Sequence, residues 1–542
     1  MILRIVLIFS ICVHFWSIST AEADSLINVP LNLDLSDFNR ETYRFIHRLL
    51  NKRVVSGVPR GSLPFTRKQV ASILLEAAEK LENNQIVLSD IDQKRLDQLL
   101  AFYTEAGTET PPKRRLHLMT LTDKSTYRFS FDLRAAHQEI TRLVDNVSEL
   151  PADEGNMHVT TFYPHLYGQY KDSFAFTTDM AYRFLYGDIF EDVYQDESKY
   201  RQLEGELKNR TAVNAYMKFN TDWAEFLVGQ DNIQWGPGYN GSLLVSHNPI
   251  SFDMLKIQST FKTVTFTGFT AILEDRSVDI NEKYISGHRA EGYFWDRFGF
   301  GISEVVVYGN RFEPGYLNPV NIYLISEQTI SRADSRTPGS GDNVFASVDL
   351  RLRPINNLEI YGELMVDDGN PAASFKHWDT KFGLLGGIYL TDPFGLQDTD
   401  VHVEYAFVNQ YAYTHVNPYN VYRHFSAVIG HHIGSDADNL WITFRRRFTD
   451  KLETVFGYEL ERHGEGDVIL SHPPDAPADD LWTPLSGITE SEHRLRLGFN
   501  WVDMGRYSIY GEWSRIWRRN VDNIADMNES GNEIEAKALY RF

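Results

Sequence analysis

The stretch that decides the fold is a hairpin pattern at residues 348–366, VDLRLRPINNLEIYGELMV. Apolar residues alternate with charged or polar residues on both sides of a turn at Pro354–Asn357. The same alternation returns at Leu495, Leu497 and Phe499. A period of two predicts β-strands with one apolar and one polar face. Such strands occur both in soluble sandwiches, where the apolar face is buried, and in membrane barrels, where it faces lipid.

The lengths of the connections separate these two possibilities. From about residue 125 onward, short turns and long connections alternate strictly, as expected for a barrel with turns at one rim and surface loops at the other. If successive connections are assigned to the two rims in turn, which we call the strand parity, the chain holds about 18 strands between Ser125 and Phe542, an even number. We therefore predict a mainly β protein, an antiparallel outer-membrane barrel. The short turns are Lys171–Ser173, Asn220–Asp222, Trp295–Arg297, Pro354–Asn357, Thr449–Lys451 and Val502–Gly505, and the long connections are 186–210, 235–251, 309–341, 413–438 and 462–491.

The last residues of the chain add an independent sign. Apolar and charged residues alternate from Glu533 to Phe542, and the chain stops on an aromatic residue. A terminal Phe on an amphipathic strand resembles the signal that outer-membrane barrels present to their insertion machinery. The sequence thus predicts the barrel insertion machinery and outer-membrane lipid as partners.

A helical period precedes the strands, within residues 37–106. One apolar stripe starts at Phe38, a second follows a capping-box pair at Thr66 and Gln69, and a third follows Ser89 and Asp92. Pro111 and Pro112 then end helical structure. We predict a small helical bundle at residues 24–115, in the periplasm, and a transmembrane barrel at residues 116–542.

The N-terminus has the features of an export signal. Arg4 precedes an apolar run at Ile5–Phe15, and Ala21-Glu22-Ala23 offers a small-x-small cleavage pattern. We predict a signal peptide at residues 1–23 and localisation in a Gram-negative type outer membrane. Cys12, the single cysteine, lies in this signal, so the mature chain has no disulfide or thiolate chemistry.

Composition narrows the classes of function. A net charge of −21 excludes nucleic acid as a partner, because phosphate binding needs an excess of Lys and Arg. The 28 Tyr, 34 Phe, 10 Trp and 36 Gly favour aromatic strands and turns. No zincin, nucleophile-elbow or phosphate-loop motif is present, so we predict neither an enzyme nor a cofactor or metal. The adjacent pair His431-His432 is expected to point apart and not to share a metal.

Polar and aromatic blocks gather in the long connections. The first is GQDNIQWGPGYNGS at residues 229–242, followed by FDML at 252–255; the second includes YLNP at 316–319; the third is NPYN at 417–420. Tyr and Trp rings stack on pyranose faces, while Asn, Gln and Asp exchange hydrogen bonds with hydroxyls. The strand parity places all three blocks at the surface rim.

These blocks, in this order, resemble the capsule assembly Wzi family over nearly the whole mature chain. The resemblance implies a barrel of this strand count with a helical plug, and a lectin-like role that holds exported capsular or other surface polysaccharide. The polysaccharide-binding residues that it suggests are Asp231, Gln234, Trp235, Tyr239, Asn240, His288, Arg289, Glu304, Tyr308, Tyr316, Asn318, Asn417, Tyr419, Asn420 and Tyr422. We expect a monomer.

Several alternatives stay open at this point. The glycines and aromatics of the blocks could form turns and an interfacial girdle. His288 and Glu304 could form an acid–base couple, although nothing supplies a nucleophile. The luminal charges are expected to form a cross-strand lattice of ion pairs. The main functional alternative is a diffusion porin, because a barrel of this size is wide enough for a channel unless it is filled.

Overall fold

The computed structural model describes residues 26–31, 37–58, 60–104, 119–123, 127–147, 154–188, 201–203, 208–274, 282–330, 341–367, 380–471, 483–503 and 506–542. The predicted signal peptide and the predicted domain boundary near residue 115 lie outside these residues. No helix among them is both long and apolar enough to cross a bilayer.

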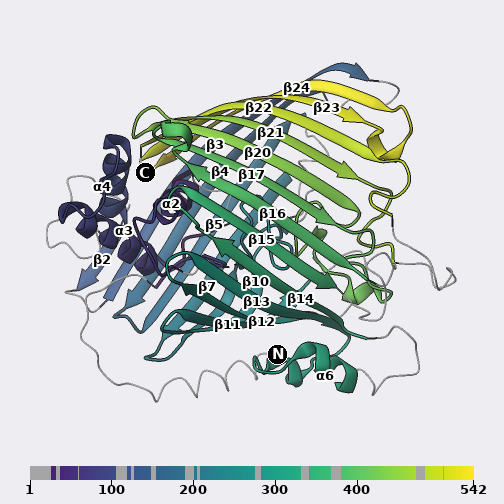
Figure 1. The fold of residues 1–542 in the computed structure, drawn as a ribbon, viewed down its shortest axis with the longest axis horizontal. Helices are drawn as coiled ribbons and strands as arrows, with labels where there is room; N and C mark the ends of the chain where they lie inside the picture. The colour runs from purple at the N-terminus through teal and green to yellow at the C-terminus, as the bar shows by residue number, and fades with distance from the viewer. Residues whose placement is uncertain are drawn as a thin grey trace.

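Antiparallel strands form one closed barrel (Figure 1). Eighteen strands of the described residues make the ring, each paired with its neighbours in the chain, and β24 pairs with β3 to close it. Two short strands, β2 (Met119–Asp123) and β6 (Arg201–Leu203), pair with β3 and β7 as additions to the ring. The predicted class and strand number are confirmed. The ring strands are β3 (Tyr127–Val147), β4 (Gly155–Tyr170), β5 (Phe174–Gly187), β7 (Lys208–Asn220), β8 (Glu225–Asp231), β10 (Phe252–Phe261), β11 (Val264–Leu273), β12 (Lys283–Phe294), β13 (Phe298–Gly309), β14 (Asn343–Leu352), β15 (Leu358–Asp367), β16 (Phe382–Thr391), β17 (Thr399–Val408), β20 (Ala437–Arg447), β21 (Leu452–His463), β22 (Glu490–Asp503), β23 (Tyr507–Arg519) and β24 (Asn528–Arg541).

The predicted rhythm of the connections also holds. Two residues join β10 to β11 and three join β12 to β13, whereas the chain from β13 to β14 runs through a 3-10 turn, η3 (Pro314–Leu317), and a helix, α6 (Tyr323–Ile330). Between β17 and β20 lie η6 (Pro418–Asn420) and the small hairpin β18 (Arg423–His424) and β19 (Ala427–Val428). The barrel thus has a short-turn rim and a long-loop rim.

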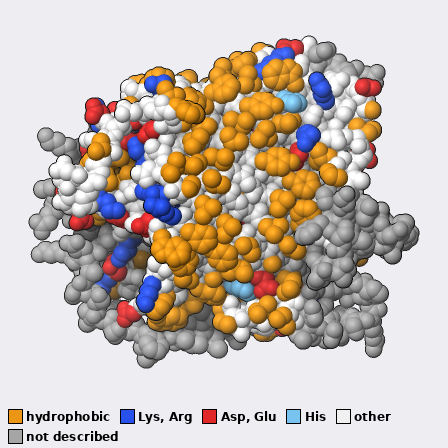
Figure 2. Space-filling view, viewed as in Figure 1, with side chains coloured by type: hydrophobic (Ala, Val, Ile, Leu, Met, Phe, Trp, Pro, Cys, Tyr) orange, Lys and Arg blue, Asp and Glu red, His pale blue; other side chains and the backbone are white. Residues whose placement is uncertain are grey.

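The apolar faces of the strands point outward. In the hairpin that opened the sequence analysis, Leu352 is 44% exposed, whereas its neighbours Arg351 and Arg353 are buried. In the last strand Tyr540 and Phe542 are outward, and the Phe542 amide donates to the Leu133 carbonyl across the closing seam at 3.0 Å. Figure 2 shows hydrophobic side chains spread over the barrel wall. An apolar outside and a polar inside identify a membrane barrel of the outer-membrane type.

Three helices lie at the short-turn rim: α2 (Asp37–Asn51), α3 (Arg67–Glu82) and α4 (Asp90–Thr104) (Figure 1). The predicted capping box forms, since Thr66 and Gln69 exchange side-chain and backbone hydrogen bonds. The three apolar stripes share one core, which includes Phe45, Leu74 and Leu99. We call residues 37–104 the plug.

Candidate functional site

Two long connections fold inward instead of standing at the surface. The first inner loop is residues 232–251, which include β9 (Gln234–Trp235), and the second inner loop is residues 409–436. Their apolar side chains form one core with luminal residues of the wall between β8 and β20. The core residues from the two loops include Ile233, Trp235, Leu243, Leu244, Val245, Ala412, Tyr413, Tyr422, Val428, Ile429 and Ile433.

Buried hydrogen bonds fix the two loops to each other. The Tyr413 hydroxyl donates to the Leu243 carbonyl at 2.5 Å, and the Tyr422 hydroxyl donates to the Leu244 carbonyl at 2.7 Å. The Ser246 amide donates to the Ile429 carbonyl at 2.8 Å. Satisfied polar groups of this kind specify one loop arrangement inside a low-dielectric interior.

Carboxylates of the barrel wall hold the first inner loop in the lumen. Glu363 accepts from the amides of Leu243 and Leu244 at 2.9 and 3.1 Å, and Glu404 accepts from the amides of Tyr239 and Asn240 at 2.7 and 2.9 Å. Two luminal charges thus act as acceptors for loop backbone. Glycines permit the tight path, because a Cβ at Gly238 would lie 1.7 Å from the Gly241 carbonyl oxygen.

The first inner loop reaches the plug. A two-residue strand of the plug, β1 (Ser62–Leu63), pairs with β9, so that Ser62 lies opposite Trp235 and Leu63 opposite Gln234. The Arg60 guanidinium bonds to the Tyr239 hydroxyl and to Glu359 of the wall. Loop, plug and wall therefore meet in one contact region within the lumen.

Arg48 attaches the plug to the short-turn rim. Its buried guanidinium binds Asp92 of α4 at 2.9 Å, Asp392 of the β16–β17 turn at 2.6 Å and Asp400 of β17 at 2.9 Å. Burial alone would raise the pKa of the Asp92 carboxyl, but Arg48, Arg447 and Lys52 hold this pKa below its usual range. The Asp92 carboxylate therefore stays ionised at neutral pH and keeps the cation bound.

The lumen is filled unevenly. On the wall against which the inner loops pack, luminal side chains such as Asp349, Arg351 and Glu359 are almost fully buried. On β20–β24, luminal charges such as Glu459, Arg494 and Arg496 are only half-buried. We call this second region the open half of the lumen, defined by the luminal faces of β20–β24.

The predicted lattice of ion pairs is present on both sides. Arg289 binds Asp349 at 2.5 Å, Arg351 binds Glu291 at 3.1 Å, and Arg494 binds Glu533 at 3.2 Å. Glu363 departs from the prediction, since it accepts hydrogen bonds from the inner loop and from Ser347.

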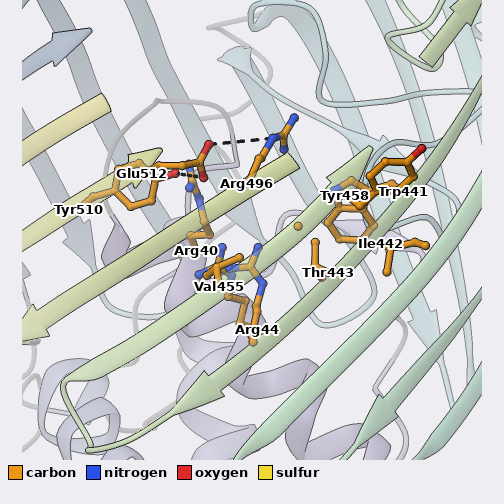
Figure 3. A pocket seen from close by; sticks show the side chains of 12 residues that line it. Arg40, Arg44, Trp441, Ile442, Thr443, Val455, Tyr458, Arg496, Tyr510 and Glu512 are labelled. Atoms are coloured by element: carbon orange, nitrogen blue, oxygen red, sulfur yellow. Dashed lines mark hydrogen bonds and ion pairs between the residues drawn. The ribbon is translucent and has the colours of Figure 1, made fainter. Parts of the chain in front are cut away.

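A cavity of about 130 Å³ lies at the base of the open half (Figure 3). Arg40 and Arg44 of the plug face it from below, and Trp441, Arg496, Tyr510 and Glu512 line its walls. Arg445 is the fourth arginine of the lining; Glu453 pairs with Arg44 and Arg445, and Glu459 pairs with Arg496. Aromatic and guanidinium groups around a polar cavity are suited to a hydroxylated, anionic ligand.

The first and third sequence blocks come together in the lumen, whereas the strand parity predicts that they meet at the surface rim. Asp231, Gln234, Trp235, Asn420 and Tyr422 are nevertheless buried. These residues pack the inner loops and present no free face. Tyr239, Asn240, Asn417 and Tyr419 are half-buried.

The second block lies elsewhere. His288, Glu304 and Tyr308 point to the outside of the wall, with His288 Nε2 3.2 Å from Glu304 Oε2. Tyr316 packs on Tyr308 with ring centroids 5.0 Å apart, and Asn318 follows on the same segment. Arg289 points the opposite way, into the lumen. The expected convergence of all three blocks at one mouth is therefore not seen.

The orientation of the adjacent pair His431 and His432 differs from the expectation. His431 and His432 do not point apart, because the loop turns at this point and stacks their rings 4.4 Å apart.

The cavity residues Arg40, Arg44 and Arg445 were not identified as site residues from the sequence. Their signal was weak, since arginines on an amphipathic helix and on a luminal strand face resemble ordinary solvated or paired charges.

The family model described as Capsule assembly protein Wzi matches residues 146–530. No curated protein sequence matches the chain. Among solved structures, the chain is similar to Escherichia coli Wzi, an outer membrane protein involved in group 1 capsule assembly and a carbohydrate-binding β-barrel. The identity is 14% and the TM-score 0.56, over 95% of this chain and 99% of that chain.

Weaker likenesses exist to other barrels. Pseudomonas aeruginosa OccK1 (OpdK) has 12% identity and a TM-score of 0.44, over 76% of this chain and 98% of that chain. Acinetobacter baumannii OccAB1 has 10% identity and a TM-score of 0.43, over 76% and 96% of the two chains. The family model covers the greater part of the sequence, and the chain belongs to the capsule assembly Wzi family.

Proposed function

We propose that this protein is a non-catalytic, lectin-like barrel of the outer membrane that attaches or organises exported capsular or other surface polysaccharide. Membership of the Wzi family supports this function, as does the carbohydrate binding of the structurally similar E. coli Wzi. The observation that argues most against a porin is the filled lumen, where two inner loops and the plug meet. The protein needs no partner subunit for this role and acts as a monomer.

The polysaccharide contacts the open half of the lumen and the half-buried rim residues Asn417 and Tyr419. The buried block residues hold the inner loops in shape and so position this surface. The four guanidinium groups of the cavity favour an acidic polysaccharide, although the protein as a whole is strongly acidic. Charge-assisted bonds from arginine to carboxylate are strong and planar, so a uronic acid is a suitable ligand group.

Binding of a uronic acid polysaccharide to the purified barrel should exceed binding of neutral dextran and should weaken with salt. Arg496→Gln should weaken it about tenfold, because one charge-assisted contact is lost. Biolayer interferometry on immobilised glycans measures both effects. Arg311→Gln on the outer wall is the matched control and should bind as the unaltered protein does. Equal binding of neutral and acidic glycans would reject the acidic ligand, and a stable large conductance without any glycan binding would favour the porin.

Orientation follows from the same proposal. The long-loop rim faces the cell exterior, and the plug faces the periplasm. An epitope inserted at Val416, which is 64% exposed in the second inner loop, should be labelled on intact cells. The same epitope at Asn356, in the short β14–β15 turn, should be labelled only after the outer membrane is permeabilised. The reverse pattern would invert the orientation.

Phe542 serves as the signal for the barrel insertion machinery. Deletion of Phe542 should lower the amount of folded, heat-modifiable barrel in the outer membrane, because recognition and the closing bond to Leu133 are both lost. Phe542→Tyr, which keeps a terminal aromatic ring, should be inserted normally. Immunoblots of unheated membrane samples measure the folded fraction, and equal amounts in all three strains would exclude this role.

A further inference from the structure

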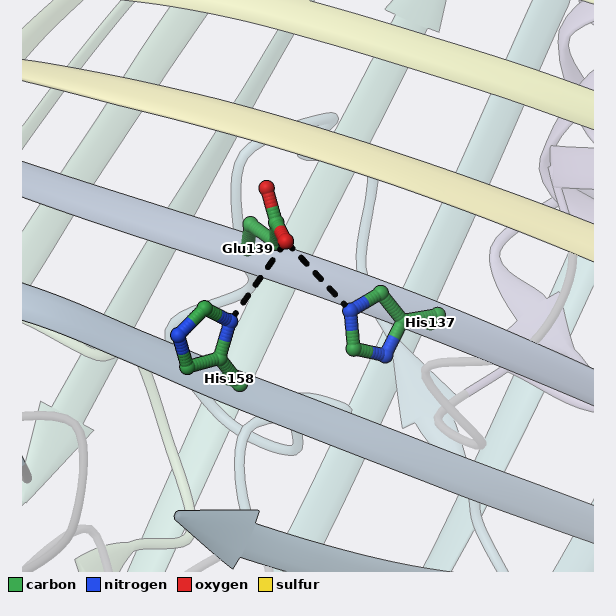
Figure 4. A group of neighbouring side chains, drawn as sticks. All are labelled: His137, Glu139 and His158. Carbon is green, nitrogen blue, oxygen red and sulfur yellow. Dashed lines mark ion pairs between the residues drawn. The ribbon is translucent and has the colours of Figure 1, made fainter. Parts of the chain in front are cut away.

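Three side chains gather on the outer surface of the barrel, away from the lumen. His137 and Glu139 of β3 and His158 of β4 point to the same side, and Glu139 lies directly opposite His158 in the ladder (Figure 4). Glu139 Oε1 is 3.6 Å from His137 Nε2 and 3.5 Å from His158 Nδ1. All three potential ligand atoms lie within 4.8 Å of one another.

This spacing fits a small cation. Bond lengths of about 2.0–2.1 Å place the ligand atoms of a tetrahedral Zn²⁺ about 3.3–3.4 Å apart. Two of the three ligand edges are thus close to their bound length before any rearrangement. The third edge, between the two imidazole nitrogens, is within 4.8 Å and closes by a small adjustment of the side chains.

Neighbouring groups hold both imidazoles in a suitable orientation. His137 Nδ1 is 3.0 Å from the Thr160 hydroxyl, which leaves Nε2 directed at Glu139. The His158 ring stacks on Tyr186, with centroids 5.0 Å apart. A hydrogen bond to the distal nitrogen is the usual support of a metal-bound histidine.

We propose that His137, Glu139 and His158 form a site for a divalent transition metal, with Zn²⁺ as the reference ion. Two histidines and one carboxylate leave a fourth position open to the outside. Exposed Tyr186 lies against both histidine rings on the outer wall, where an aromatic side chain is typical of the interface between lipid and water. The sequence analysis predicted no metal site, because the three ligands belong to two strands whose register the sequence does not show.

The test titrates Zn²⁺ and Co²⁺ into the folded protein in detergent. We expect saturable Zn²⁺ binding and the visible absorption of tetrahedral Co²⁺. His158→Ala and Glu139→Gln should abolish both, and Thr160→Val should weaken binding about 10–100-fold while keeping the barrel folded. Heat modifiability on gels confirms that each variant is folded.

A second cluster provides the control. His432, Glu459 and Glu461 also lie close together, but Glu459 already binds Arg496 and Glu461 binds His463 at 2.8 Å. His432→Ala should leave the Co²⁺ spectrum unchanged. A spectrum lost in His432→Ala and kept in His158→Ala would overturn the proposal, as would absence of saturable binding by the unaltered protein.

A different observation concerns the connection between β13 and β14. Residues 310–326, which we call the outer flap, lie against the outside of the wall and pack on β11, β13 and β14. Tyr316 and Tyr323 are buried there against Tyr308, and Pro319 sits over Gly268 of β11. A Cβ at residue 268 would lie 2.9 Å from Pro319 Cβ, so the glycine makes room for the flap.

The flap also satisfies an outward-facing carboxylate. Glu304 accepts from the amides of Tyr323 and Leu324 at 2.8 and 2.7 Å, at the N-terminus of α6. Ile302, one outward position earlier on β13, is 51% exposed on the lipid-facing wall. A carboxylate next to the lipid-facing surface requires such partners, because lipid offers none.

The free side of the flap is apolar. Val320 is 80% exposed and Ile325 is 59% exposed, and Leu317, Ile322 and Leu324 are exposed as well. We infer that the outer flap is an interfacial anchor, inserted among the lipids that surround the barrel.

A spin label tests this inference, and the mature sequence lacks cysteine that would compete for the label. A nitroxide at Ile325→Cys, in vesicles of phosphatidylcholine, should collide with oxygen more than with a water-soluble nickel chelate. Val416→Cys at the exposed loop rim should show the opposite preference. Preference for the nickel chelate at residue 325 would reject the anchor, and dipolar broadening would assign the flap to contact with a second copy.

Discussion

Replacement of Arg48 by alanine should detach the plug and open the barrel to ions. The change leaves Asp92, Asp392 and Asp400 without the buried cation that they share. Loss of one partner from a buried ion-pair network costs about 3–5 kcal/mol, because the remaining charges stay desolvated. The inner loops fill only one side of the lumen, and the plug closes the open half from below. We therefore expect steady conductance in planar bilayers and a lower melting temperature of the plug.

Lys68→Ala is the matched control for this experiment. Lys68 also joins the plug to a short turn, through Asp172 at 3.3 Å, but the lysine side chain is 38% exposed. An exposed pair contributes about 0–1 kcal/mol, so this variant should remain closed. Arg48→Ala with unaltered melting and no conductance would show that the plug is held by its other contacts.

Trp235→Ala should destabilise the first inner loop without removing a sugar contact. Trp235 is 1% exposed and packs edge-on against Phe269 at 5.1 Å, and a Cβ at Gly287 of β12 would lie 3.1 Å from its ring. Truncation of a buried Trp to alanine costs about 3–5 kcal/mol. We expect easier proteolysis of residues 232–251 and lower heat stability, with unchanged glycan retention per folded molecule.

Trp235→Phe separates packing from hydrogen bonding. The Trp235 Nε1 group has no hydrogen-bond partner within the described part of the chain. Phenylalanine keeps most of the ring volume and removes the unsatisfied donor, so stability should change little. Limited proteolysis and glycan binding on the same preparations provide the measurements. Normal stability of Trp235→Ala together with lost glycan binding would restore the ring as a sugar contact.

The barrel could be predicted from the sequence because its signals are local. The alternation in Val348–Val366 predicts strands with one apolar and one polar face, and the turn at Pro354–Asn357 marks one rim of the barrel. The regular order of short and long connections then predicts the number of strands. The capping pair at Thr66 and Gln69 likewise needs only three residues of chain. Local patterns of this kind survive in any tertiary context.

The site could be predicted only in part, because the path of a long loop depends on distant contacts. Glu363 and Glu404 pull the first inner loop into the lumen, and neither carboxylate differs in sequence from an ordinary luminal charge. The position of the second block on the outer wall could have been predicted from the sequence. Ile302, Glu304 and Tyr308 are separated by even numbers of residues on one strand, so they lie on the same face of the wall. The adjacent residues His288 and Arg289 lie on opposite faces. Consistent use of that alternation would have placed His288 and Glu304 on the outer wall.

The short ladder between β1 and β9 joins chain segments that belong to opposite sides of the membrane protein. A pull on the first inner loop is transmitted through backbone hydrogen bonds, such as that from the Gly236 amide to the Gly61 carbonyl at 3.1 Å, into the plug. The loop cannot be drawn outward unless this ladder breaks or the plug moves with it. Tension applied to the first inner loop is therefore transmitted to the plug through backbone hydrogen bonds.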